Sequence, residues 1–144
     1  MTIMHESTGV LGTRLLRKED PALLTGEAKY TSDLNIPGAL HLAVLRSPYA
    51  HARITSVDLS AAAAMPGVVA AYSGADLQGH WAGPMPCAWP VTADMKNPTH
   101  YPLAVSKAAY VGDGVACVLA TSDAAARDAL DAIDVQYEPL PAVV

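Results

Sequence analysis

Four side chains that could supply a nucleophile, a base and an acid occur close together in the first half of the chain. They are Ser47, His41, His51 and Asp58. A serine nucleophile needs a histidine within hydrogen-bond distance and an acid behind that histidine. The spacing of these residues does not indicate such an arrangement. The sequence therefore favours a structural role for His51 and the nearby Arg53, at a turn or an interface, over a small independent hydrolase.

Three potential metal ligands, His80, Cys87 and His100, lie in a long irregular stretch. Zinc sites are usually marked by closely paired ligands, such as two cysteines with two residues between them. The wide spacing here does not predict a site, and we expect no metal ligand in this chain. The other cysteine, Cys117, lies in an apolar run and is interpreted as a small buried hydrophobic residue.

Lys107 is the residue that supports a different class, a carrier protein. The segment from Val105 to Ala108 faintly resembles the modified-lysine hairpin of lipoyl and biotinyl domains. The acid or methionine expected just before that lysine is replaced here by Ser106. An ordinary surface lysine is the favoured interpretation, and a stand-alone small-molecule-binding or carrier module is the alternative function.

Composition limits the class of protein. The chain has 144 residues and a mass of 15.0 kDa, the size of one domain. A net charge of −5 argues against nucleic-acid binding, because that needs a basic surface. No apolar run is long enough to span a bilayer, and the N-terminus lacks the pattern of a secretory signal. We expect no nucleic-acid partner, no membrane span and a cytoplasmic location.

Strand and helix patterns alternate in the first half of the chain. The expected elements are strands at 40–45, 54–57 and 68–72, a turn at 47–50, a helix at 61–65 and a brief helical turn at 73–77. Asp58 and Ser60 stand where the helix cap would be. Pro66 and Gly67 then end the helix, because proline cannot donate the next hydrogen bond and glycine accepts the left-handed exit.

A short helix is also expected near the N-terminus. Glu19-Asp20-Pro21 indicates its start, and Gly26 its end. Leu23 and Leu24 are expected to pack inward. The chain is interpreted as an N-terminal arm at residues 1–11 followed by a single domain at residues 12–144.

An irregular stretch rich in proline, glycine and tryptophan, at 78–102, separates the two halves. A loop of this length in a compact domain is usually functional or bound by a partner. The elements expected after it are strands at 107–111, 115–120 and 133–137 and a helix at 124–132. Gly112-Asp113-Gly114 predicts a hairpin turn between the first two of these strands. Arg127 and Asp131 are spaced for a surface ion pair on the helix.

Three separated blocks of sequence resemble one protein family. The blocks are the opening pattern from Gly12, RSPYAHARI with the small-residue helix that follows it, and YVGDGVACVLATSDAAARDALDAIDVQYEPLPAVV. They are similar to the N-terminal α/β hammerhead domain of the molybdenum hydroxylase large subunit, found in xanthine dehydrogenase, aldehyde oxidase and aerobic carbon monoxide dehydrogenase. The resemblance covers nearly all of residues 12–144 except the irregular stretch. It implies an α+β fold with mixed small sheets and two or three short helices.

The resemblance also implies a parent enzyme, an oxidoreductase that carries a molybdenum–pterin centre. Its 2Fe-2S clusters and FAD would lie on partner subunits or domains. The partners of this chain would then be the remaining molybdenum-binding part of the large subunit and the iron–sulfur and flavin subunits.

The chemistry of the parent is not expected to reside in this chain. Two cysteines cannot hold a four-cysteine cluster. The pterin-binding loops and the catalytic glutamate of the family belong to later parts of the large subunit. We therefore expect no catalytic or cofactor-binding residue here, and a structural role in which Arg46, His51 and Arg53 hold an interface or a turn together.

Overall fold

The computed structural model describes residues 12, 14–87, 89 and 91–143, and the chain divides into two compact units, 1–38 and 39–144. The first unit holds the helix α1 (Asp20–Leu24) and a 3-10 helix, η1 (Thr31–Asp33). Pro21 lies in the first turn of α1, and Gly26 follows with a φ of +76°, so the predicted helix start and end are confirmed. The inward packing predicted for Leu24 is wrong, because this side chain is 87% exposed. The predicted arm at residues 1–11 lies outside the described residues.

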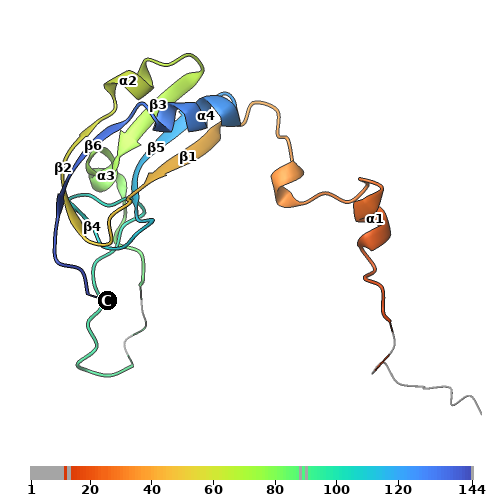
Figure 1. The fold of residues 1–144 in the computed structure, drawn as a ribbon, viewed down its shortest axis with the longest axis horizontal. Coiled ribbons are helices and arrows are strands. Elements are labelled where there is room, and N and C mark those ends of the chain that lie inside the picture. Colours follow the sequence, from red (N-terminus) through yellow and green to blue (C-terminus); the bar gives the residue numbers. More distant parts are fainter. Residues whose placement is uncertain (1–11, 13, 88, 90, 144) are drawn as a thin grey trace, which may run out of the picture. The chain divides into compact units, whose positions relative to one another are not determined.

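Two three-stranded antiparallel sheets form the second unit (Figure 1). The β5 sheet has the order β1 (His41–Arg46), β5 (Gly114–Ala120), β3 (Val68–Ser73). The β2 sheet has the order β4 (Lys107–Ala108), β2 (Ala52–Asp58), β6 (Asp134–Pro139). Together with its short helices, this architecture confirms the α+β class and the hammerhead arrangement of small sheets.

Short helices pack on the β5 sheet. They are α2 (Ser60–Ala63), α3 (Gly74–Leu77), which runs into the 3-10 helix η2 (Gln78–His80), and α4 (Asp123–Leu130). Ala62 from α2, Ala129 from α4 and Val118 from β5 form a fully buried cluster. Small side chains at Ala62 and Ala129 let the helices approach the sheet closely.

Local details of two helices differ from the sequence prediction. The N-cap of α2 is Leu59, and Asp58 instead accepts a hydrogen bond from the amide of Ser60 at 2.9 Å. On α4, Arg127 pairs with Asp123 at 2.8 Å. The pairing predicted for Arg127 with Asp131 is therefore wrong, because Asp131 is already the C-cap residue at the end of the helix.

The chain passes to the other sheet between every two consecutive strands from β1 to β6, and this overturns the predicted hairpin. The strand before Gly112 belongs to the β2 sheet, where Lys107 lies opposite Arg53. The strand after it belongs to the β5 sheet. Gly112 does adopt a positive φ of +92°, so the glycine turn exists. Turn residues specify a local bend, and here the strands on either side of the bend pair with other partners.

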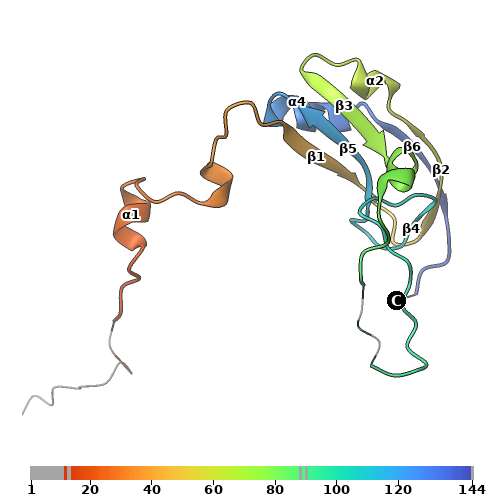
Figure 2. The ribbon, with the colours of Figure 1, turned by 180° about the vertical axis from the view of Figure 1, so that it is seen from behind.

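The irregular stretch at 78–102 extends beyond the ends of the sheets in both views (Figures 1 and 2). Its two ends are joined by one isolated bridge, in which the amide of Met85 donates to the carbonyl oxygen of His100 at 2.8 Å. Trp81 stacks on Tyr101 with ring centroids 5.1 Å apart. These contacts fix the base of the loop.

Candidate functional site

Two crossovers between the sheets, the one after β1 and the one before β5, meet at a junction formed by Arg46, Ser47, Gly112 and Asp113. The amide of Ser47 donates to the carbonyl oxygen of Asp113 at 2.8 Å, and the amide of Gly112 donates to the carbonyl oxygen of Ser47 at 2.8 Å. The guanidinium Nη1 of Arg46 donates to the carbonyl oxygen of Gly112 at 2.8 Å. The junction therefore couples the end of β1 to the start of β5.

Asp113 is the buried charge of this junction and is only 2% exposed. Its Oδ2 accepts a hydrogen bond from the amide of Ala109 at 3.0 Å. Its Oδ1 is buried without a hydrogen-bond partner among the described residues. Burial raises the pKa of Tyr110, and the nearby Asp113 carboxylate raises it further. Burial likewise raises the pKa of Tyr137, and a hydrogen bond between its side chain and that of Ser47 opposes that shift.

Of the three residues predicted to hold a turn or an interface, Arg46 is part of this junction, whereas His51 and Arg53 have partners elsewhere. Arg46 contacts Gly112, in the crossover before β5. The ring Nδ1 of His51 lies 2.7 Å from the carbonyl oxygen of Pro141, which requires the proton on Nδ1. Arg53 on β2 lies opposite Glu138 on β6, and its Nε is 3.1 Å from the carboxylate. His51 and Arg53 thus contact β6 and the segment that follows it.

The structure does not assemble the imagined nucleophilic site. The buried hydroxyl of Ser47 donates to the carbonyl oxygen of Tyr49 at 3.1 Å. The hydrogen bonds from Ser60 that lower the pKa of Asp58 also occupy its carboxylate. His41 begins β1, at the opposite end of the strand from Ser47. Ser47 and Asp58 therefore form separate local hydrogen bonds, and no nucleophile–base–acid arrangement results.

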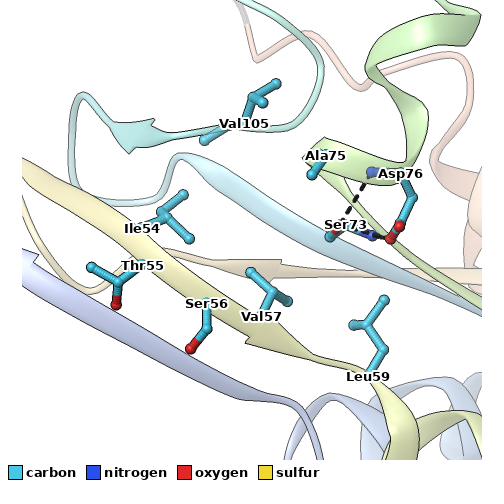
Figure 3. A pocket seen from close by; sticks show the side chains of 11 residues that line it. Ile54, Thr55, Ser56, Val57, Leu59, Ser73, Ala75, Asp76 and Val105 are labelled. Carbon is cyan, nitrogen blue, oxygen red and sulfur yellow. Dashed lines mark hydrogen bonds between the residues drawn. The ribbon is translucent and has the colours of Figure 1, made fainter.

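A cleft of about 350 Å³ lies between β2 and the start of α3 (Figure 3). Its walls include the apolar side chains of Ile54, Val57, Leu59 and Val105. The polar side is formed by Ser73 and Asp76, which cap α3. The amide and the hydroxyl of Ser73 donate to Asp76 Oδ2 at 2.8 and 2.7 Å, and these bonds lower the pKa of Asp76, the hydroxyl more than the amide.

The carboxylate of Asp76 is engaged in the cap, and Thr55 and Ser56 also line the cleft, so polar and apolar groups share its surface. Sequence analysis placed a helical turn here and missed the cap. The signal was present, since a serine followed three residues later by an acid is the pattern of a capping box. Asp113 was missed for a different reason, because it was interpreted as a residue of an exposed hairpin turn.

The metal candidates are not brought together. Within residues 12, 14–87, 89 and 91–143, no group of three or more histidine, cysteine or acidic side chains is placed to hold a metal ion. Cys87 is exposed, and His100 Nε2 lies 3.4 Å from the hydroxyl of Tyr110. Cys117 is buried in β5, where burial raises the pKa of its thiol.

Two further features bear on the class of protein. Lys107 is exposed and lies in β4 opposite Arg53, so it is not presented at the tip of a tight hairpin as a carrier lysine would be. In the described part of the chain, no helix is long and apolar enough to cross a bilayer.

Comparison with known proteins places this geometry among enzyme subunits. Residues 25–141 match the profile of the family described as aldehyde oxidase and xanthine dehydrogenase, a/b hammerhead domain. The nicotine 6-hydroxylase large subunit of Paenarthrobacter nicotinovorans is 43% identical over 136 residues, which are 94% of this chain and 16% of that protein. The carbon monoxide dehydrogenase large chain of Hydrogenophaga pseudoflava is 35% identical over 91% of this chain and 15% of its own length.

Among solved structures, quinoline 2-oxidoreductase from Pseudomonas putida 86 superposes with a TM-score of 0.79 at 45% sequence identity. The match covers 92% of this chain and 16% of that chain. The sequence therefore spans about 16% of the length of the relatives it matches.

Proposed function

Because this chain belongs to the aldehyde oxidase and xanthine dehydrogenase a/b hammerhead domain family, we propose that it acts as a structural and interface domain of a molybdopterin-dependent oxidoreductase large subunit. The observation that carries the proposal is coverage: 94% of this chain aligns with only 16% of a relative named as a large subunit. The remaining length of such a subunit is available to supply the reacting groups.

In this proposal, the parent enzyme carries a molybdenum–pterin centre, with 2Fe-2S and FAD on partner subunits or domains. The names of two relatives support the molybdenum–pterin centre. One solved structure is a Cu,Mo-CO dehydrogenase, and one relative, from Eubacterium barkeri, is a large molybdopterin subunit. The partners of this chain are then the molybdenum-binding remainder of the large subunit and the iron–sulfur and flavin subunits. Residues 12–144 act as one domain, residues 1–11 as an arm, and the enzyme is cytoplasmic.

Arg46, His51 and Arg53 are proposed to hold the interface. The Arg53–Glu138 ion pair is 62% and 60% exposed at its two side chains, and ion pairs of this kind contribute little to folding. Its guanidinium therefore stays accessible to a carboxylate or a carbonyl group of the partner. His51 supports the same surface by fixing the carbonyl oxygen of Pro141.

The test is Arg53→Ala in the native protein, with Arg127→Ala as the matched control. Arg127 is also in an exposed ion pair, with Asp123, but it lies on α4, whereas Arg53 lies on β2. We expect Arg53→Ala to reduce assembly with the other subunits while the unfolding midpoint barely changes, and Arg127→Ala to leave assembly intact. Equal loss of assembly and folding in Arg53→Ala would contradict the interface role.

Intact mass and molybdenum content of the protein from its native source test the proposal as a whole. A larger polypeptide, or a complex that contains molybdenum, is expected. A lone chain of 15.0 kDa without metal would overturn the proposal and favour the carrier module instead. In that case a mass increment on Lys107 would be the decisive measurement.

A further inference from the structure

The central strand of the β5 sheet is apolar on both of its faces. Its sequence, GVACVLA, carries no charged or strongly polar side chain, and the strand is buried at every position except the partly exposed Leu119. An antiparallel strand with one face in solvent usually alternates apolar and polar residues. A continuous apolar run is instead typical of a strand that is covered on both sides. The sequence of β5 therefore requires cover on both faces of the sheet.

One face has such cover. Val118 of β5 is fully buried against Ala62 of α2 and Ala129 of α4, and Ala71 of β3 packs on the same cluster. Figures 1 and 2 show α4 lying along this sheet, and α4 contacts β1, β3 and β5.

The opposite face is formed by the neighbours of Val118, because successive side chains of a strand point to opposite sides. Cys117 pairs with Val44 and Tyr72, and Leu119 pairs with Leu42 and Ala70. Residues directly opposite each other in a sheet share a face. We call the set of these six residues the open face: Leu42, Val44, Ala70, Tyr72, Cys117 and Leu119.

Cover of the open face is incomplete within the described part of the chain. At one end, Leu103 is 5% exposed and lies near Val44 and Gly114, where a Cβ added to the glycine would approach a methyl group of Leu103 to 3.1 Å. Farther along the face, Leu42 is 60% exposed and Tyr72 is 38% exposed. Large apolar side chains gathered on one exposed surface mark an interaction site.

We propose that the open face is the docking surface for an apolar, uncharged segment of the large subunit that lies outside these 144 residues. The proposal rests on the proposed function, under which these 144 residues make up about 16% of the length of the large subunit. The occupant must be apolar, because none of the six side chains carries a charge. It packs on Leu42 and Tyr72, on the two strands that flank β5, because Cys117 between them is already buried, and it extends the second layer over the edges of the sheet.

Hydroxyl-radical footprinting of the native protein tests this docking. Leu42 and Tyr72 are expected to be oxidised as slowly as fully buried side chains, despite their exposure here. Leu42→Glu places a charge on the open face and should release the occupant, so that Tyr72 loses its protection. Ala61→Glu adds the same charge on the exposed side of α2 and should leave Tyr72 protected. Leu42→Met should also keep the protection. If Leu42→Glu fails to fold, Leu42→Asn replaces it.

Rapid oxidation of both Leu42 and Tyr72 in the unsubstituted native protein would overturn the docking. Continued protection of Tyr72 in a folded Leu42→Glu variant would overturn it as well. Protection that disappears when a dimer of this chain dissociates on dilution would replace the proposed occupant by a second copy. These outcomes leave the proposed function intact, whereas a 15.0 kDa native chain without molybdenum would refute that function by itself.

Discussion

The amide of Ser47 donates to the carbonyl oxygen of Asp113 at 2.8 Å, and each of these residues is 2% exposed. This bond joins two of the places where the chain passes from one sheet to the other, the one after β1 and the one before β5. Because main-chain groups make this contact, it does not depend on the side chains of Ser47 and Asp113. Burial of these two residues is the main restriction on which side chains fit there. The side chains of Arg46, His51 and Arg53 then add contacts around a backbone that is already fixed.

Asp113 is expected to matter as a hydrogen-bond acceptor more than as a charge. Asp113→Ala leaves the amide of Ala109 without its acceptor in a buried position, which costs about 1–3 kcal/mol. Asp113→Asn keeps an acceptor oxygen and removes the carboxylate oxygen that has no partner. We therefore expect asparagine to cost clearly less than alanine in urea unfolding at neutral pH. An asparagine variant no more stable than the alanine variant would contradict this assignment.

Gly74 is required by close packing. A Cβ at this position would overlap the carbonyl group of Ala104, whose carbon atom would lie 2.7 Å away. Gly74→Ala should therefore lower the free energy of unfolding by about 1–3 kcal/mol, the usual range for overpacking. Gly79→Ala is the matched control, because a Cβ at Gly79 meets no atom within 4 Å. Equal thermal unfolding midpoints for the two variants would disprove the steric argument.

The cap of α3 predicts a stability change at acidic pH. Hydrogen bonds from Ser73 hold the pKa of Asp76 below its ordinary value of 3.8. The carboxylate thus contributes stability that is complete above the pKa of the unfolded chain and is lost as the pH falls through the folded pKa. The stability difference between the unsubstituted protein and Asp76→Asn should be full at neutral pH and shrink below pH 3.8.

The same pH titration has an internal control in Ser73→Ala. The hydroxyl of Ser73 is the largest cause of the lowered pKa of Asp76, so its removal should reduce the pH-dependent part of the difference. Unfolding curves for the four combinations of the two substitutions measure this coupling. A pH-dependent difference of the same size with and without the hydroxyl would show that Ser73 does not control Asp76.

The two cysteines should react with thiol reagents at very different rates. Cys87 is exposed, whereas Cys117 is buried in β5 and burial raises the pKa of its thiol. Because the thiolate is the reactive form, Cys117 should react slowly at pH 8 until the protein unfolds. Absorbance measurements with an aromatic disulfide reagent would then show one fast and one slow thiol. Cys87→Ser should remove the fast phase, and a persistent fast phase would contradict the burial of Cys117.

Much of the fold could be predicted because its signals are local. The strands predicted at 68–72 and 133–137 and the helix predicted at 124–132 all appear in the structure, as β3, β6 and α4. The family resemblance was confirmed over residues 25–141. The hairpin at Gly112 failed because strand pairing is a non-local property. A glycine turn specifies a bend, and the sequence around it does not say which sheet each strand joins.

The contacts of the candidate site are also non-local and could not be predicted from the sequence. Arg46, His51 and Arg53 could be selected from one short segment, but their partners Gly112, Pro141 and Glu138 come from the far end of the chain. Residue types alone indicated that these side chains would bind something. The identity of each partner depends on how β1 and β2 cross into different sheets, which no local pattern encodes. The role of the three residues at an interface stays a prediction.

The alternation of strands between the two sheets also sets the order of events when the chain is synthesised. The first strand, β1, pairs with β5, and the second, β2, forms its long ladder with β6, the last strand in the described part of the chain. Both early strands therefore leave the ribosome well before their partners exist, and loop closure must precede these pairings. The unpaired edge of β1 is exposed to aggregation until β5 emerges, and that of β2 stays exposed until β6 emerges. All strands of the β5 sheet are present once Ala120 has been made, whereas the β2 sheet must wait for Asp134–Pro139.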